Sequence, residues 1–113
     1  MKINGTNIYM IRGDSETITV SCKDIDGADL LFTTGDQIYF TVKENTKTAV
    51  KILQKLIVDF TDGKAIIDIL QSDTKLLKYQ TYVYDIEWIN VNGKVTTIIP
   101  PSKFIIEDEV TYE

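Results

Sequence analysis

Apolar and polar residues alternate along much of this chain. From Glu16 to Lys23, the apolar side chains of Ile18, Val20 and Cys22 alternate with threonine and serine. Successive side chains of a β-strand point to opposite faces, so this period of two indicates a strand that is buried on one face. The same period recurs in three later segments, at 37–44, 64–70 and 80–89.

We predict that these strands pack one face each into a common core. A short apolar segment, Asn7–Arg12, and a longer one, Ile52–Phe60, are interpreted as further strands, with Leu56, Val58 and Phe60 sharing a face of the second. Leu30–Phe32 is interpreted as a short strand or a packed loop. The predicted inward positions are Ile38, Phe40 and Val42, and Tyr82, Tyr84, Ile86 and Trp88. Ala65, Ile67 and Ile69 share one face of their segment and alternate with Ile66 and Asp68.

Two short glycine turns predict hairpins. Asp62-Gly63 supplies the positive φ angles of a tight turn, so segment 64–70 is predicted to pair back onto the strand before it. Asn92-Gly93 predicts a second hairpin in the same way, with 95–99 pairing onto 80–89.

The remaining signals concern strand ends and one helical turn. Pro100-Pro101 is predicted to end its strand, because proline cannot donate to a ladder, and Phe104–Val110 is predicted as the last strand. A single helical turn is predicted near 72–77, with Ser72 as its cap. No segment is long enough for a helical crossover between parallel strands.

These elements predict one all-β domain over residues 1–113, built from antiparallel sheets of about seven to eight strands. The run from Leu76 to Tyr84 places a turn before a strand whose Tyr82 lies on the buried face. That arrangement resembles the tyrosine corner of immunoglobulin-like domains, which favours a two-sheet immunoglobulin-like sandwich over a barrel. The cysteine pair and the strand C tryptophan of antibody domains are absent, so only the architecture carries over.

Composition narrows the function classes. The net charge is −5 and no segment is strongly basic, so we expect no nucleic-acid binding. The chain has no histidine and one cysteine, Cys22, which excludes histidine-based catalytic groups and internal disulfides. Asn4 and Gly5 interrupt the first residues before an apolar signal segment can form, and no apolar run has the length of a membrane span. We therefore expect synthesis in the cytoplasm and no membrane partner.

Four features invite a chemical interpretation, and each has a simpler structural one. Asp85 and Glu87 share a strand face and could form a carboxylate pair, but outward carboxylates are more often solvated. Asp24–Asp29 is rich in aspartate but fails the calcium-loop spacing, and whether this turn binds an ion is left open. Arg12-Gly13-Asp14 spells an adhesion tripeptide but is also an ordinary strand end followed by a turn. The tyrosines predicted to be partly exposed are Tyr9, Tyr39, Tyr79 and Tyr112.

The sequence consequently predicts no catalytic, cofactor-binding or metal-binding residue, and we expect no enzyme activity. A row of coplanar exposed tyrosines would suit sugar binding. The strand Gln80–Ile89 cannot supply such a row, because its aromatic residues are needed in the core.

Several segments together resemble small structural proteins of phages and prophages of Gram-positive bacteria. The most specific are the Arg12-Gly13-Asp14-Ser15 opening and the Tyr82-Val83-Tyr84-Asp85-Ile86 strand. The others are Gly35–Lys43, Asp73-Thr74 with Leu76 and Leu77, Val95–Ile98 and Phe104–Ile106. The chain is similar to the N-terminal immunoglobulin-like domain of phage baseplate upper proteins, which docks a receptor-binding apparatus onto the tail.

That resemblance implies a non-enzymatic structural or adaptor module of a baseplate or tail, located in the virion. Its implied partners are other phage structural proteins, with self-association left open. The chain ends soon after Val110 and lacks the long fibre extension that such proteins often carry, so a stand-alone adaptor fits better than a complete receptor-binding protein. The alternative hypothesis is a carbohydrate-binding module that recognises host cell-wall glycans.

Overall fold

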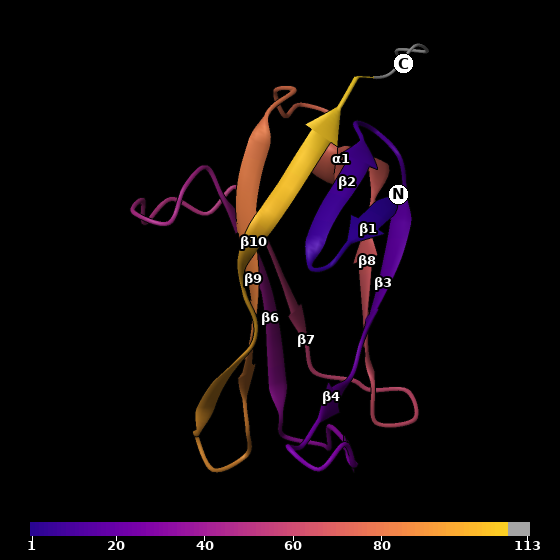
Figure 1. The fold of residues 1–113 in the computed structure, drawn as a ribbon, viewed down its shortest axis with the longest axis vertical. Helices are drawn as coiled ribbons and strands as arrows, with labels where there is room; N and C mark the ends of the chain where they lie inside the picture. The colour runs from indigo at the N-terminus through magenta and orange to yellow at the C-terminus, as the bar shows by residue number, and fades with distance from the viewer. Residues whose placement is uncertain (109–113) are drawn as a thin grey trace.

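A computed structural model describes residues 1–108 of the chain, which form ten β-strands and one short helix (Figure 1). The strands are β1 (Lys2–Asn4), β2 (Asn7–Ile11), β3 (Glu16–Val20), β4 (Cys22–Lys23), β5 (Asp29–Leu30), β6 (Gln37–Lys43), β7 (Leu53–Ile57), β8 (Ala65–Ile69), β9 (Thr81–Ile89) and β10 (Val95–Glu107). The helix is α1 (Gln71–Thr74). The prediction of a mostly β fold is confirmed.

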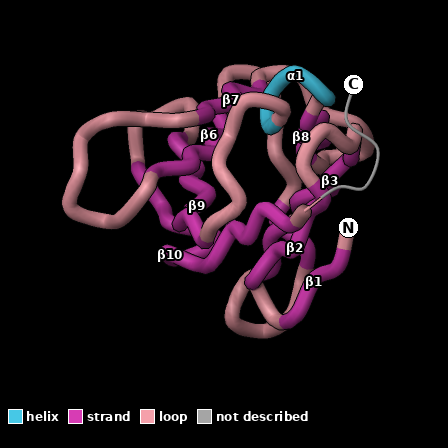
Figure 2. The backbone as a smooth tube through the Cα atoms, turned by 90° about the horizontal axis from the view of Figure 1, so that it is seen from above, coloured by secondary structure: helices cyan, strands magenta, loops and turns pink. Residues whose placement is uncertain are grey.

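Six strands form one sheet in the order β1-β2-β10-β9-β6-β7. β3 pairs with β8, and β4 pairs with β5, in two smaller sheets. Seen from above, the large sheet curves around the interior, with β3 and β8 on the opposite side (Figure 2). Side chains from the large sheet and from the β3–β8 pair belong to the same buried cluster, so the two sheets share one core.

The core follows the predicted alternation. Ile38, Phe40 and Val42 of β6 are fully buried, as are Ala65, Ile67 and Ile69 of β8. The rings of Phe40, Tyr84 and Phe104 pack together, with centroids 5.4 to 6.2 Å apart. Burial of such large apolar side chains is the main favourable term in folding.

The strand partner predicted for β8 is wrong. Asp62 and Gly63 have positive φ angles of 52° and 73°, and Thr61 pairs with Lys64 around them, so the tight turn itself forms as predicted. The two strands that it connects then diverge: β7 pairs with β6, and β8 pairs with β3. The turn therefore carries the chain from one sheet to the other.

Leu56, Val58 and Phe60 were predicted to share a face, but of these three only Phe60 packs against the core. Leu56 and Val58 are about half exposed, at 47% and 48%, whereas Leu53 and Ile57 pack against the core. Apolar residues occupy both odd and even positions of this segment, so the alternation of the sequence does not show which face of the strand is buried. Lys55 shares the inner face, because its ammonium group reaches the carboxylate of Asp73 at 2.7 Å.

β10 runs through Pro100 and Pro101, contrary to the predicted break. Its register against β9 shifts between Thr97 and Ile99 and again between Ile99 and Ser102, so both prolines fall at a bulge. Bulges are among the few places where a sheet accepts proline. The strand ends at Glu107, and residues 109 and 110 of the predicted Phe104–Val110 strand lie outside the described residues.

One pairing departs from the predicted antiparallel arrangement. β2 and β10 are parallel, with Phe104 opposite Ile8 and Ile106 opposite Met10. The two strands lie near opposite ends of the sequence, so no hairpin forces them to be antiparallel. All other strand pairs are antiparallel in the described part of the chain.

The helical turn starts two residues earlier than a cap at Ser72 would give. α1 begins at Gln71, and the carboxylate of Asp73 accepts the backbone N–H of Leu70 at 2.7 Å. Ser72 is exposed and does not cap the turn. Thr74 is fully buried, and its hydroxyl accepts the backbone N–H of Gly13 at 2.9 Å, which fastens the turn to the end of β2.

Tyr82 lies on the buried face of its strand, as predicted, and its hydroxyl bonds to the backbone four residues earlier. Its side chain is 2% exposed, and its hydroxyl both donates to the carbonyl of Lys78 and accepts that residue's N–H, each at 3.1 Å. Removing the hydroxyl leaves two backbone groups without these partners. Tyr82→Phe is therefore expected to lower the free energy of unfolding by about 1–3 kcal/mol. Urea denaturation measures this, and Tyr9→Phe, at a half-buried ring outside the core, serves as the matched control that should change it little.

Burial also makes stability sensitive to high pH. Loss of solvent contact raises the pKa of Tyr82 and of Tyr84 above the ordinary value of 10.0. The unfolded chain then releases these protons at lower pH than the folded protein, so the stabilisation is complete below pH 10 and is lost as the pH rises through the folded pKa. Urea midpoints measured from about pH 8 to 11 should fall at the alkaline end, and less steeply in Tyr84→Phe. If the urea midpoint of Tyr84→Phe fell as steeply with pH as that of the native protein, Tyr84 would not contribute to the pH dependence.

Candidate binding surfaces

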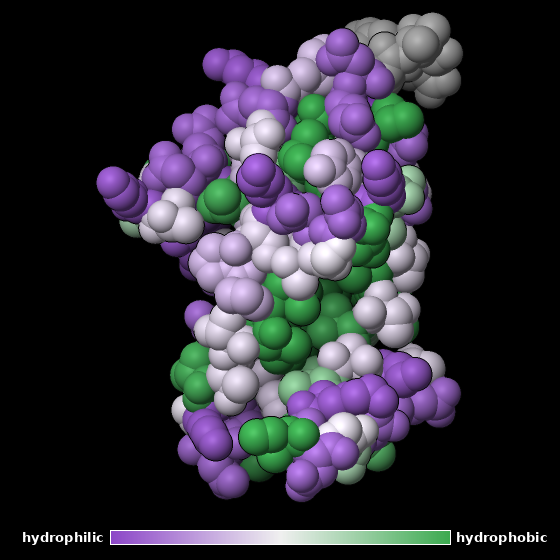
Figure 3. Space-filling model, viewed as in Figure 1, coloured by the Kyte–Doolittle hydropathy of each residue, from purple (hydrophilic) through white to green (hydrophobic). Residues whose placement is uncertain are grey.

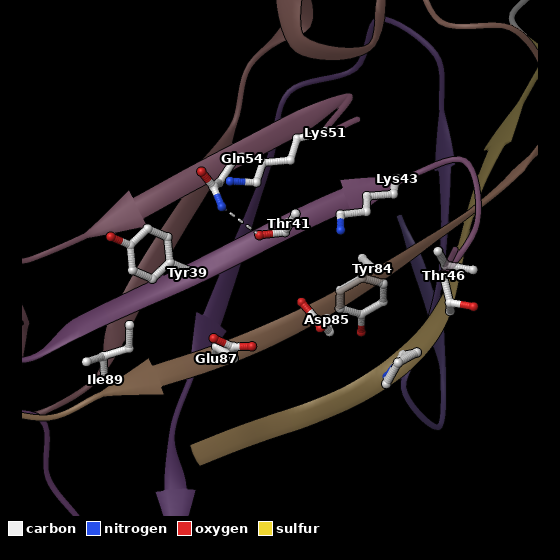
Figure 4. Close-up of a pocket in the computed structure, with 12 residues that line it drawn as sticks. Tyr39, Thr41, Lys43, Thr46, Lys51, Gln54, Tyr84, Asp85, Glu87 and Ile89 are labelled. Carbon is white, nitrogen blue, oxygen red and sulfur yellow. Dashed lines mark hydrogen bonds between the residues drawn. The ribbon is translucent and has the colours of Figure 1, made fainter. Parts of the chain in front are cut away.

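A groove lies on the outer face of the large sheet, over β6, β7 and β9 (Figure 4). Its volume is about 530 Å³, within the usual range of ligand sites. Loop 44–52, which stands out from the sheet in Figure 1, contributes Thr46 and Lys51, and Pro101 of β10 contributes as well. Asn45 fixes the base of this loop, because its side-chain oxygen accepts the backbone N–H groups of Lys47 and Thr48.

Strand register decides which side chains meet in the groove. Thr41 of β6 lies opposite Gln54 of β7 on one side and opposite Asp85 of β9 on the other. The amide nitrogen of Gln54 donates to the Thr41 hydroxyl at 3.0 Å. The next pair on the same face of the sheet is Tyr39 opposite Glu87. The groove thus presents ordered rows of polar groups.

Charges of both signs line the groove. Lys43 and Lys51 contribute ammonium groups, and Asp85 and Glu87 contribute carboxylates from β9 (Figure 4). Within residues 1–108, no ion pair joins either lysine to either carboxylate. The predicted outward position of Asp85 and Glu87 is confirmed, and both half-buried side chains line the groove.

A second surface forms at the lower end of the molecule in Figure 1, where three loops meet. We call this the loop end; it consists of residues 24–36, 58–64 and 90–95. Its exposed aliphatic side chains are Ile25, Leu30, Leu31, Val58, Val91 and Val95. Ile25 is as exposed as in an extended chain, at 101%.

The buried carboxylate of Asp36 ties two of these loops together. One of its oxygens accepts the N–H of Thr33 at 2.8 Å, and the other accepts the N–H of Val91 at 3.1 Å. The third loop is attached by the bond from the Phe32 N–H to the Gly63 carbonyl, at 3.0 Å. A side chain at Gly63 would start 2.7 Å from Leu31, so the loops also pack closely. The loop end is therefore a fixed surface.

Asp36→Ala removes both acceptors from a site that is 3% exposed. We expect it to lower the free energy of unfolding by about 1–3 kcal/mol. Hydrogen exchange should also accelerate at Thr33 and Val91 relative to amides of β6. Asp36→Asn keeps one carbonyl oxygen and should lose less of the free energy of unfolding. An equal loss in both variants would show that the bonds from Thr33 and Val91 do not account for the stabilisation.

The aspartate-rich turn at Asp24–Asp29 is held by its own hydrogen bonds. One carboxylate oxygen of Asp24 accepts the N–H groups of Asp26 and Ala28, each at 2.9 Å. Within the described residues, no group of three or more acidic or cysteine side chains has a geometry that could hold a metal ion.

The Arg12-Gly13-Asp14 tripeptide is built into the fold. The Arg12 guanidinium stacks over the Tyr79 ring at 4.1 Å and donates to the Leu77 carbonyl at 3.3 Å. The N–H of Asp14 donates to the Ile11 carbonyl across a turn at Gly13. These contacts support the structural interpretation of this sequence.

The predicted exposed tyrosines do not share one surface row. Tyr9 lies on β2 and Tyr39 on β6, with β10 and β9 between these strands. Tyr79 precedes β9 and packs under Arg12, and Tyr112 lies outside the described residues. Cys22 was expected to be buried; it is partly buried and packs against the core.

The register that brings Tyr39 next to Glu87 was not foreseen, because it depends on which strands become neighbours. No helix among residues 1–108 has the length and apolar character needed to cross a membrane. No protein-family model matches the sequence, and no curated protein matches it.

Proposed function

We propose that this protein is a non-enzymatic structural module of a phage or prophage particle, acting as a baseplate or tail adaptor through protein–protein contacts. The observation that carries this proposal is the loop end, where exposed aliphatic side chains stand on loops fixed by Asp36. The assignment to a particle rests on the sequence resemblance to phage structural proteins.

An immunoglobulin-like sandwich is the fold that we infer within the observed β architecture. The order β10-β9-β6-β7 corresponds to the G-F-C-C′ order of a variable-type immunoglobulin sheet, and β3 pairs with β8 as strand B pairs with strand E. The hydrogen bonds between Tyr82 and Lys78 have the form of a tyrosine corner. Both features support the inference.

The loop end has the make-up of a contact surface. Loops that are held by hydrogen bonds lose little backbone conformational entropy on binding, so more of the burial energy contributes to affinity. Apolar residues also extend along the side of the molecule between β10 and β3, visible as green atoms bordered by white and purple ones in Figure 3. A partner that covers the loop end could continue onto this strip.

The neighbouring charges favour a partner of opposite sign. Asp24, Asp26 and Asp29 are exposed or half-buried around Ile25. Asp59 and Asp62 are exposed next to Val58 and Gly63, while Lys23, Lys64 and Lys94 reduce the local excess. An apolar patch with an acidic rim suits a partner surface that has a basic rim.

The resemblance motifs contribute to the framework. Arg12 and Gly13 attach the end of β2 to Tyr79 and Thr74, and Tyr82 and Tyr84 lie in the core. Relatives that share these motifs would share the scaffold, while their loop ends could differ with the partner. We therefore place the specificity of docking in the loops.

The test uses particles released by a producing strain and purified by density gradient. Mass spectrometry should detect the native protein in particles. The double variant Ile25→Asp/Val58→Asp should be reduced at least about tenfold, since it buries two unpaired charges in the contact. Leu76→Asp, at a residue 89% exposed near α1, is the matched control and should be incorporated normally.

Circular dichroism of each purified variant checks that the fold is retained. Absence of the native protein from particles would overturn the proposal. Normal incorporation of the double variant would overturn the assignment of the contact to the loop end.

A further inference from the structure

We propose that the groove over β6, β7 and β9 binds a neutral, polyhydroxylated ligand, namely a short oligosaccharide. This site lies on the outer face of the large sheet and uses none of the residues of the loop end. It is therefore an activity beyond the docking role and can be tested separately from it.

The floor of the groove offers side chains rather than free backbone groups. β6 pairs with β7 on one edge and β9 on the other, and β9 pairs with β6 and β10, so their backbone groups are used in ladders. A peptide lying over β6 and β9 would find no free backbone donors and acceptors for its own main chain, and β7 is free only along its outer edge. Each sugar hydroxyl can both donate and accept, so side-chain groups alone can satisfy it.

The side chains provide complementary partners for hydroxyl groups. Asp85 and Glu87 are acceptors, and charge-assisted hydrogen bonds are the strong ones. The bond from the Gln54 amide nitrogen to Thr41 fixes the amide, with its oxygen pointing away from Thr41 (Figure 4). The Tyr39 ring next to Glu87 offers an apolar surface for the C–H groups of a sugar.

The mixture of charges argues for a neutral ligand. A phosphate or other anion beside Lys43 would also lie near Asp85 (Figure 4). An anion there would thus gain one attraction and suffer one repulsion of similar range. A neutral polyol meets both kinds of group through hydrogen bonds, with the carboxylates accepting and the ammonium groups donating.

One aromatic ring and an open groove imply modest affinity. Dissociation constants of about 0.1–10 mM are expected for single short ligands, a range that NMR titration measures well. The probes are neutral oligosaccharides of two to four rings, chosen from the hits of a neutral glycan array, with inorganic phosphate and a mixed-charge tripeptide as comparison ligands.

The expected result is a set of amide shift changes confined to residues 39–46, 51–54 and 83–89 on addition of a neutral oligosaccharide. Asp85→Ala and Gln54→Ala should each weaken binding about tenfold or more, because each removes hydrogen bonds to the sugar. Asp68→Ala, an exposed carboxylate on the opposite sheet, is the matched control and should leave the affinity unchanged.

The proposal is overturned if no neutral glycan binds, if the shifts map outside the groove, or if phosphate or the tripeptide binds there more tightly than every sugar. It is also overturned if both groove variants keep native affinity while their spectra show a native fold. Particle incorporation is measured separately, so failure here leaves the docking proposal intact, and failure there leaves this one intact.

Discussion

The pairing of β6 with β9 is the constraint on which the rest of the molecule depends. The two strands stay in one register from Gln37 opposite Ile89 to Lys43 opposite Val83. Because side chains alternate, that register places Phe40 and Ile86 in the core and, at the same time, sets Thr41 beside Asp85 on the outer face. A slip by one residue would bury the polar side chains of these strands and expose the apolar ones. The free energy of burying the core therefore stabilises the register that forms the groove.

At the two ends of the sheets, single carboxylate side chains hold the loops and the helix in place, whereas apolar packing holds the strands together in the middle. Asp36 holds two loops at one end, while at the other Asp73 caps α1 and pairs with Lys55 of β7. Asp36 accepts two backbone N–H groups, and Asp73 accepts the backbone N–H of Leu70 and pairs with the Lys55 ammonium group. A carboxylate removed from water is tolerated when such partners satisfy it. Loops tied down so closely can present a fixed surface to a partner.

The sequence predicted what depends on local period and missed what depends on neighbours. Alternation found the inner faces of β6, β8 and β9, and the Asp62-Gly63 turn was correct. The inner face of β7 was not identified, because apolar residues occupy both faces of this segment; Leu53 and Ile57 pack against the core, and Lys55 on the same face pairs with Asp73. The partner of β8 and the parallel β2–β10 pair were missed because strand order is a long-range property. The groove was missed for the same reason: Asp85 and Glu87 were recognised as outward, but β6 and β7 supply the rest of the lining.

Docking through the loop end would strengthen the binding of sugars in the groove. The core uses Tyr82 and Tyr84, which leaves Tyr39 as the ring available to the groove, so a single copy can offer only weak sugar binding. If copies are fixed in a particle through their loop ends, their grooves are presented repeatedly at fixed spacing. Neighbouring grooves on one polymer then bind at high effective concentration, and avidity can exceed the single-site affinity by about 10²–10⁴. Weak binding at one face and firm docking at another are thus physically compatible parts of one module.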